Sequence, residues 1–273
     1  MLRFVHISDS HLSTPQYANY GHQSYPNLEA VIEAINNLPF AVDFVLHTGD
    51  VAQNGAPEEY ALAKPLLARL RFPIYYANGN HDNADLLQRE LVGLQQPSER
   101  YDQVFSAQGM QIAIFDSANR RDHTGLLTAA QLEALRRLCT PEGAPLILVL
   151  HHPPVPLDAP WIDQGWAVPN RPPYGSMLLA NWQAFQAAIA PARQRLRGVF
   201  FGHVHHAHQV WHDGVFYCAA PSTFGQLASY PGQLAPQPTP EQPAAFNLVS
   251  VDAEQLTVRQ CAVRRPNVHL AAC

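Results

Sequence analysis

The sequence predicts an α/β fold with a largely parallel sheet, because short apolar runs alternate with segments of helical spacing along most of the chain. The apolar runs have the length of buried strands, and several end at polar residues. The segment Leu28–Leu38 illustrates the helical pattern, since Val31, Ile32 and Ile35 repeat at intervals of three and four. Strands and helices that alternate in this way are typical of βαβ units.

The first half of the chain contains three predicted strands and two predicted helices. In order, these are a strand over Leu2–Ile7, a helix over Leu28–Leu38, a strand over Asp43–His47, a helix over Pro57–Leu70 and a strand over Phe72–Ala77. Pro57 suits the first turn of its helix, where no amide hydrogen is needed.

The same alternation continues in the second half. The expected elements are a strand over Ile112–Phe115, a helix over Thr128–Leu138, a strand over Pro145–Leu150, a helix over Asn181–Ile189 and a strand over Gly198–Phe201. Thr128 can cap the open amides of its helix. A long loop rich in proline and aromatic residues, Val155–Met177, separates the last helix from the strand before it.

The tail of the chain has a different character. The segments Val215–Ala219, Phe246–Val251 and Leu256–Arg264 have β character, and the Pro-rich loop Pro231–Pro243 lies between the first two. These strands are too few to bury a core of their own. We therefore predict one domain over residues 1–273, with the strands of 244–264 completing it.

Composition excludes several classes of protein. The chain has 273 residues, 47% of them hydrophobic, and its 17 basic and 22 acidic residues argue against a nucleic-acid groove. The longest apolar run, Ala144–Leu150, is far shorter than the ~20 residues of a membrane-spanning helix. The segment Met1–Asp9 meets polar residues too early for the apolar region of a signal peptide. A cytoplasmic protein is expected.

Polar clusters follow five of the predicted strands, at the point where each strand ends. They are Asp9–His11, Gly49–Asp50, Gly79–Asp82, His151–His152 and Gly202–His205. Ligands of parallel α/β sheets bind outside the carboxyl ends of the strands. Aspartate, asparagine and histidine without cysteine suit metals such as Mn, Fe, Co, Ni or Zn, so a metal site is predicted at this edge.

Spacing supports the metal site. Residues two apart in an extended segment point the same way, so Asp9 with His11, and His203 with His205, can each grip one ion. Gly49, Gly79 and Gly202 directly precede candidate ligands and permit close approach of the backbone. Each motif alone is compatible with an ordinary turn, whereas five in order at strand ends favour a shared site.

The ordered motifs resemble those of the calcineurin-like metallophosphoesterase superfamily. They read Asp-x-His, Gly-Asp, Gly-Asn-His-Asp, His-His-Pro-Pro and Gly-His-x-His, and the resemblance runs from about residue 2 to about residue 226. Within the superfamily the chain is most similar to the class III cyclic-nucleotide phosphodiesterases and related glycerophosphodiesterases. That narrower likeness depends on Ser8–Leu12, Pro57–Tyr60, Gly125–Thr128 and His151–Pro156.

This resemblance implies a four-layer αββα sandwich of two mixed sheets flanked by helices, with the C-terminal strands in the second sheet. It also implies two divalent or trivalent metal ions. Asp9, His11 and His205 would hold the first ion, Asn80, His151 and His203 the second, and the Asp50 carboxylate would bridge both. His81 would lie beside the pair and contact phosphate without binding a metal.

The activity implied is hydrolysis of a small phosphodiester, with 3′,5′-cyclic AMP as first choice and a glycerophosphodiester as second. A metal-bound hydroxide would attack phosphorus in line with the leaving oxygen. His81 would stabilise negative charge or protonate that oxygen. The alternatives are a phosphomonoesterase, a nucleotide pyrophosphatase on the same scaffold, or a binding protein without turnover.

For several other aromatic and histidine side chains the sequence allows more than one role. Trp161, Trp166 and Tyr174 of the long loop could stack on a nucleobase, pack onto their own domain, or contact a second copy in a homodimer. His152 is expected either beside the metal ligands or in loop packing. Two further histidines, His47 and His123, fit none of the clusters.

Overall fold

The apolar run at the N-terminus forms β1 (Leu2–Ile7) in the middle of a six-stranded sheet, the first sheet. The computed structural model describes residues 1–14, 21–119, 123–264 and 269–271. On one side of β1 lie the parallel strands β2 (Phe44–His47) and β3 (Ile74–Tyr76). On its other side lie the antiparallel strands β12 (Ala244–Val251), β13 (Leu256–Arg264) and β14 (His269–Ala271).

The second sheet also has six strands and a parallel centre. Its order is β4 (Gln103–Ala107), β5 (Met110–Ile114), β6 (Leu146–Val149), β7 (Leu196–Phe201), β9 (Val215–Ala219) and β8 (Gln209–His212). The four strands from β5 to β9 run parallel, and β4 and β8 add antiparallel edges. Each sheet is therefore mixed.

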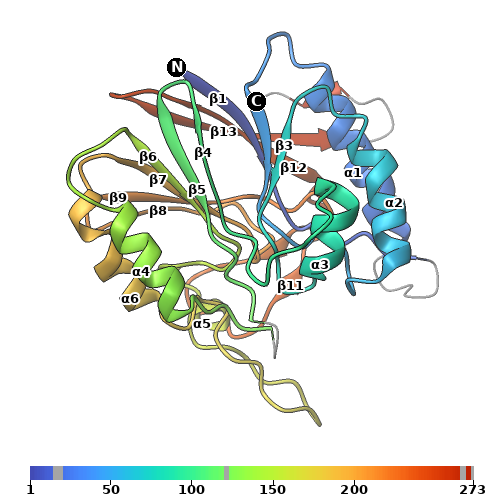
Figure 1. Cartoon of the computed structure of the whole chain (residues 1–273). Helices are drawn as coiled ribbons and strands as arrows, with labels where there is room; N and C mark the ends of the chain where they lie inside the picture. The colour runs from blue at the N-terminus through green and yellow to red at the C-terminus, as the bar shows by residue number, and fades with distance from the viewer. Residues whose placement is uncertain (15–20, 120–122, 265–268, 272–273) are drawn as a thin grey trace.

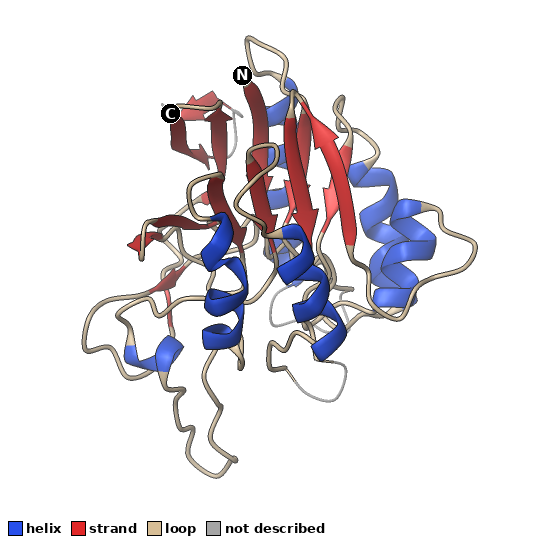
Figure 2. Ribbon diagram, turned by 60° about the vertical axis from the view of Figure 1, so that its left-hand side comes forward, coloured by secondary structure: helices blue, strands red, loops and turns tan. Residues whose placement is uncertain are grey.

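Helices cover the outer face of each sheet (Figures 1 and 2). The longer ones are α1 (Gly21–Asn36), α2 (Pro57–Leu67), α4 (Ala129–Leu138) and α6 (Trp182–Ile189). Val31 and Ile35 of α1 pack against Val5 of the first sheet, whereas Leu135 of α4 and Phe185 of α6 join the core outside the second sheet. Short turns complete the set: α3 (Ala84–Leu86), η2 (Leu87–Val92), α5 (Pro160–Asp163) and η3 (Ala190–Ala192). The predicted four-layer αββα sandwich is confirmed.

An aromatic core fills the space between the sheets. The Phe4 ring of the first sheet stacks on Phe44 at 5.2 Å between centroids and meets the edge of Phe200, from the second sheet, at 5.1 Å. Ile112 and Val149 of the second sheet belong to the same cluster. The two sheets thus share one buried layer, which fixes how their strand ends lie relative to each other.

The C-terminal strands correct one expectation. Residues 244–264 were predicted to complete the second sheet, but β12 pairs with β1, with Leu2 opposite Val251, and so extends the first sheet. The reason lies in the two apolar faces of β12. Phe246 and Leu248 pack on the side of α1, and Val249 and Val251 pack between the sheets. Such a strand fits the interior of a covered sheet.

Several elements had no clear signal in the sequence. The edge strand β8 alternates exposed and half-buried residues, and β4 is similar, so neither forms an apolar run. The Pro-rich segment carries part of a small ribbon, in which β11 (Gln237–Pro238) pairs with β10 (Leu227–Ala228). The predicted helix cap at Thr128 is confirmed, since its hydroxyl accepts from the Gln131 amide at 3.2 Å.

Among the residues that the structure describes, none of the helices combines the length and the apolar character needed to cross a bilayer. The single domain, the cytoplasmic location and the homodimer stay predictions.

Candidate active site

The predicted clusters meet where the parallel strands of both sheets end (Figure 1). Asp9 and His11 follow β1, Asp50 follows β2 and Asn80 follows β3, so the first sheet supplies these four. His151 follows β6, and His203 and His205 follow β7, so the second sheet supplies the rest. Because the two sheets pack face to face with these ends at one edge, seven side chains distant in sequence come together.

The first group of donors consists of Asp9, His11 and His205. The two imidazole Nε2 atoms lie 2.9 Å apart. The Asp9 Oδ1 atom is 3.9 Å from His11 Nε2 and 3.5 Å from His205 Nε2. All three donor atoms therefore lie close together, and the expected pairing of Asp9 with His11 is present. The expected pairing of His203 with His205 on one ion is not, because His205 joins Asp9 and His11 while His203 contacts His151.

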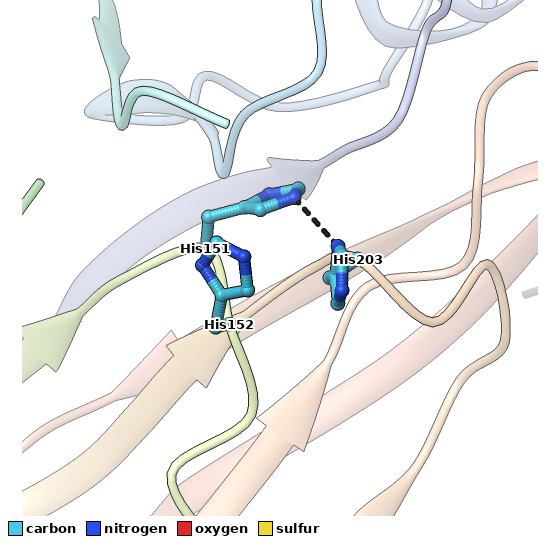
Figure 3. Close-up of side chains that lie close together, drawn as sticks. All are labelled: His151, His152 and His203. Carbon is cyan, nitrogen blue, oxygen red and sulfur yellow. Dashed lines mark hydrogen bonds between the residues drawn. The ribbon is translucent and has the colours of Figure 1, made fainter. Parts of the chain in front are cut away.

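The second group consists of Asn80, His151 and His203. His151 Nε2 lies 3.0 Å from Asn80 Oδ1 and 3.0 Å from His203 Nδ1, the contact drawn in Figure 3. The Asp50 Oδ2 atom is 3.3 Å from His151 Nε2 and 3.6 Å from His11 Nε2. Asp50 therefore lies between the two groups and touches both.

In three of the imidazole rings, a hydrogen bond at Nδ1, on the side away from the donor groups, shows that this nitrogen carries a hydrogen. The Nδ1 atoms of His11, His205 and His151 lie 2.8, 3.1 and 2.7 Å from Gln53 Oε1, the Gly225 carbonyl and the Thr48 carbonyl, which can only accept. Nδ1 therefore carries a hydrogen in each ring, and Nε2 of each ring faces the carboxylates, where it can bind either a proton or a metal ion. Metal-binding histidines are oriented in this manner.

The crowding of donor atoms is the best evidence that the site fits metal ions. His11 Nε2 and His205 Nε2 lie 2.9 Å apart, and His151 Nε2 lies 3.0 Å from both Asn80 Oδ1 and His203 Nδ1, so a proton or a metal ion must lie between these donors. The carboxylates of Asp9 and Asp50 are buried beside them. A buried charge without a partner is costly. Nitrogen and oxygen donors in this arrangement suit borderline first-row metal ions.

Electrostatics keep both carboxylates ionised. Burial alone would raise the pKa of Asp50, but the charges of His151 and His81 hold it well below the usual value. Burial opposes ionisation of Asp9 too, and His205 and His11 lower its pKa. Burial would lower the pKa of His151, yet Asp50 outweighs it and raises that pKa to about 9. A proton and a metal ion thus compete for His151.

The backbone at the site is strained in a repeated way. Asp9, His11, Asp50, His203 and His205 have φ values of 53°, 44°, 56°, 72° and 50°, in the left-handed region that residues other than glycine seldom adopt. Hydrogen bonds between neighbouring strand ends hold these conformations. The amide of Asp9 donates to the Gly49 carbonyl and that of His11 to the Asp50 carbonyl, both at 3.0 Å.

Two glycines make room for the carboxylates. A Cβ atom on Gly79 would lie 2.1 Å from Asp50 Oδ1, and one on Gly202 would lie 2.0 Å from Ser8 Oγ and 2.9 Å from Asp9 Oδ2. The backbone of either glycine cannot shift to relieve such a contact without moving the donor residue that directly follows it. The close approach predicted for these positions is present in the structure.

His81 joins the site through two separate contacts. Its backbone amide donates to Asp50 Oδ1 at 2.9 Å, and its ring Nδ1 donates to the Gln53 carbonyl at 2.7 Å. Burial lowers the pKa of His81, and the nearby Asp50 compensates only in part. With Nδ1 committed to Gln53, His81 exchanges protons through Nε2. The ring lines a cavity of about 1080 Å³, to which His11 and His205 of the first group and Asn80 and His203 of the second are exposed.

Two side chains of the site were missed by the sequence reasoning. His123, expected outside every cluster, accepts a hydrogen bond from Asn80 Nδ2 at its Nδ1 atom, 3.3 Å away, and its ring centroid is 5.3 Å from that of His81. Gln53 orients His11 and His81. The loop that carries His123 follows β5, another parallel strand that ends at the same edge, and that position was the available signal.

His152 and His47 lie behind the site. The Ser117 hydroxyl accepts from the amides of His151 and His152, so its hydrogen points to His152 Nδ1 at 2.9 Å. His152 Nε2 then donates to the His123 carbonyl at 3.3 Å. Burial lowers the pKa of His152 to about 3, which keeps it neutral. His47, also expected outside the clusters, contacts Ser10 Oγ at 2.8 Å.

Comparison with known proteins agrees with this geometry. The family model described as calcineurin-like phosphoesterase matches residues 2–207. The 3′,5′-cyclic adenosine monophosphate phosphodiesterase CpdA of Pseudomonas aeruginosa is 32% identical over 226 residues, 82% of this chain and 77% of that protein. A cAMP/cGMP dual specificity phosphodiesterase of Mycobacterium tuberculosis is 32% identical over 158 residues, 56% of this chain and 50% of that protein.

Among solved structures, a dimetal phosphatase from Danio rerio has the same fold, with a TM-score of 0.71 and 13% identity over 95% of each chain. The family model covers well over half of the residues, and its motifs are those that meet at the strand ends. The prediction of a phosphoesterase is thereby confirmed, and the chain belongs to the calcineurin-like phosphoesterase family.

Proposed function

We propose that the protein is a metal-dependent phosphodiesterase that hydrolyses 3′,5′-cyclic AMP, with a glycerophosphodiester as the second choice of substrate. The observation that carries the proposal is the pair of donor groups joined by Asp50, in which imidazole nitrogens lie only 2.9 and 3.0 Å apart. The choice of cyclic AMP is supported by the cyclic AMP phosphodiesterase that shares 32% identity over 82% of this chain.

Seven residues would hold two metal ions. The first ion would be held by Asp9, His11 and His205, the second by Asn80, His151 and His203, and Asp50 would contribute to both. The distances within each group support this division, since the donor atoms of Asp9, His11 and His205 lie close together, and His151 Nε2 lies 3.0 Å from both Asn80 Oδ1 and His203 Nδ1. Mn, Fe, Zn, Co and Ni all accept such oxygen and nitrogen donors.

Two such ions, when bound, neutralise the charge of a phosphodiester and make a water molecule more acidic. The protein's own residues orient the substrate around them. His81 presents Nε2 to the cavity while Nδ1 is held by Gln53, so its imidazole is placed to stabilise charge on phosphate oxygens or to pass a proton to the leaving oxygen. His123 lines the same cavity, next to Asn80.

The proposal is tested by activity and metal content together. The chain is prepared with Mn²⁺, Fe²⁺, Zn²⁺, Co²⁺ or Ni²⁺, and metal is counted by mass spectrometry. Each preparation is assayed with cyclic AMP, cyclic GMP, glycerophosphodiesters, bis(p-nitrophenyl) phosphate, p-nitrophenyl phosphate and a nucleotide sugar. Two ions per chain and hydrolysis of diesters, with cyclic AMP the best natural substrate, are the expected results.

A matched pair of variants separates the metal ligands from general effects of charge. Asp50→Asn keeps the shape of the side chain but removes its charge, and should lose both metal ions and activity. Glu142→Gln removes an exposed carboxylate elsewhere and should change neither. Preference for the monoester or the nucleotide sugar would identify a phosphomonoesterase or a pyrophosphatase. A chain without metal or hydrolysis would be a binding protein.

A further inference from the structure

The cavity above the donor groups is larger than a phosphate group requires. Its volume is about 1080 Å³, and its lining continues from His11, Asp50 and His205 to residues of the long loop and of the Pro-rich segment. Cavities of roughly 300–1,000 Å³ enclose whole small molecules. Space therefore remains for a substituent of the diester next to the proposed metal site.

Beyond the donor groups, the cavity wall contains polar residues such as Gln226, Thr239 and Glu241 and a set of apolar ones. We call this apolar set the apolar wall, and it consists of Trp166, Tyr174, Met177, Leu227, Pro236 and Pro238. Two chain segments contribute to it, the long loop and the β10–β11 ribbon. None of the six side chains carries a charge, so this surface suits an uncharged, flat group rather than a second phosphate.

The two aromatic residues form a fixed platform. Trp166 and Tyr174 are paired across a short antiparallel bridge with backbone hydrogen bonds of 3.1 and 2.8 Å, and their rings stack at 4.5 Å with an angle of 8°. The buried ring of Trp161 meets Trp166 edge-on at 5.8 Å. Gly165 next to the pair has φ 93°, and a Cβ there would lie 2.2 Å from the Tyr174 carbonyl oxygen.

The ribbon side of the apolar wall is attached directly to a proposed metal ligand. The Leu227 amide donates to the His205 carbonyl at 3.0 Å, and His205 Nδ1 donates to the Gly225 carbonyl at 3.1 Å. The β10–β11 pairing then carries Pro238 alongside Leu227. The wall is thus held at a constant position relative to the atoms that would bind the phosphate.

We propose that the apolar wall binds the base of a nucleotide whose phosphate lies at the donor groups. This inference rests on the proposed function and narrows its substrate to a cyclic nucleotide. Nucleobases stack on aromatic side chains through faces that every base possesses. Trp166 and Tyr174 stack on each other, so the outer face of the half-exposed Tyr174 ring is left for a base, whereas a quaternary ammonium group is bound by rings that surround it.

The proposal is tested by the binding of two phosphate monoesters, one with a base and one without. AMP and ribose 5-phosphate are titrated into the metal-loaded protein by calorimetry, and the fluorescence of the tryptophans is followed in parallel. AMP should bind about tenfold more tightly than ribose 5-phosphate, as base–aromatic stacking commonly provides. AMP should also change the tryptophan emission, and ribose 5-phosphate should leave it nearly constant.

Substitutions then locate the base. Tyr174 is 41% exposed, so Tyr174→Ala leaves the core intact and should abolish most of the AMP advantage, with unchanged affinity for ribose 5-phosphate. Trp166→Leu, which keeps an apolar contact with the core, should do the same. Trp211→Ala is the matched control, since Trp211 is 73% exposed on β8 and outside the cavity. It should bind both ligands as the wild type does.

Equal affinity of the wild type for AMP and ribose 5-phosphate would overturn the base-binding role of the wall. Hydrolysis of bis(p-nitrophenyl) phosphate by the same preparation would show that the proposed function survives that result. Loss of glycerophosphocholine turnover in Tyr174→Ala, with cyclic AMP turnover unchanged, would identify a quaternary ammonium group as the occupant and also contradict the proposal. A metal-loaded chain that hydrolyses no diester would contradict the proposed function itself.

Discussion

The backbone amide of His81 donates to the Asp50 carboxylate, while the imidazole of the same residue is bound to the Gln53 carbonyl. The backbone of His81, and not its side chain, thus holds Asp50, the proposed bridging ligand. Removal of the imidazole leaves the amide in place, and with it the hydrogen bond to Asp50. Metal binding and proton transfer by this residue can therefore be separated by a single substitution.

We expect His81→Ala to retain two metal ions per chain and to lose a factor of about 10²–10⁴ in kcat, the usual contribution of a general acid or base. The loss should be larger for diesters with poor leaving groups, because they depend more on protonation. Metal content by mass spectrometry and kcat for a series of aryl diesters measure the two effects.

His212→Ala, on the edge strand β8, is the control histidine, because it lies outside the cavity. An unchanged kcat in metal-replete His81→Ala protein would remove His81 from the chemistry. A loss of metal instead would mean that the ring itself takes part in binding.

Removal of metal should destabilise the fold. Without metal ions, only protons on the imidazoles can balance the two buried carboxylates, beside which His11 Nε2 and His205 Nε2 lie 2.9 Å apart. An ion present at a hundred times its Kd contributes about 2.7 kcal/mol. Because about 1 kcal/mol shifts Tm by roughly 2–4 °C in a protein of this size class, chelation should lower Tm by about 5 °C or more.

Thermal unfolding with EDTA and with added Mn²⁺ measures this change, and Asp50→Asn should show little dependence on metal. A Tm that is the same in both conditions, in protein shown to contain metal before chelation, contradicts the expected coupling between metal and folding.

His123 should affect one of the two metal ions more than the other. Its Nδ1 accepts from Asn80 Nδ2 at 3.3 Å and so fixes the amide with Oδ1 toward His151. His123→Ala frees Asn80 to rotate, and residues that orient a ligand typically contribute 10–100-fold to metal affinity. Competition with a metal-binding dye should therefore detect one weakened ion and one unchanged ion. Equal metal affinities of the wild type and of His123→Ala would show that His123 does not orient Asn80.

The buried His6 predicts a dependence of stability on pH. Its Nε2 contacts Thr48 Oγ1 at 3.1 Å, and burial lowers its pKa from the ordinary 6.5 to about 3. The folded chain thus keeps His6 neutral while the unfolded chain gains a proton below pH 6.5. Stability is present above that pH and falls as the pH decreases toward 3, by about 1.4 kcal/mol between pH 7.5 and 5.5.

Urea unfolding of the wild type and of His6→Gln at both pH values isolates this contribution, because all other titrating groups are shared. The wild type should lose about 1.4 kcal/mol more than the variant over this interval. The same loss in both chains would show that His6 does not control the acid sensitivity.

Strands buried on both faces were well predicted from the sequence, because their residues form continuous apolar runs. β1 and β9 have the predicted bounds, and β6 differs from its prediction by one residue at each end. Edge strands such as β4 and β8 are half exposed and lack that signal. The prediction that β12 belongs to the second sheet was wrong. A run that is apolar on both faces fits the interior of either sheet, and only the pairing with β1 places β12 in the first sheet.

The donor residues were predictable because their motifs follow strands whose carboxyl ends meet at one edge. The structure brings all seven predicted donors and His81 together, and their division between two metal ions stays a proposal. His123 was missed because a single histidine in a loop has no spacing to indicate it. Gln53 was missed because an amide that orients a histidine has no distinctive sequence pattern.

Each donor group draws on both sheets: Asp9 and His11 face His205, and Asn80 faces His151 and His203. Cations bound there would cross-link the two sheets. A slippage of the sheets by an ångström would pull both ligand sets apart at once. The packing of Phe4 against Phe200 therefore helps to keep the two ligand sets together, and a cavity created there by Phe200→Ala should weaken the binding of both metal ions although neither ring contacts them.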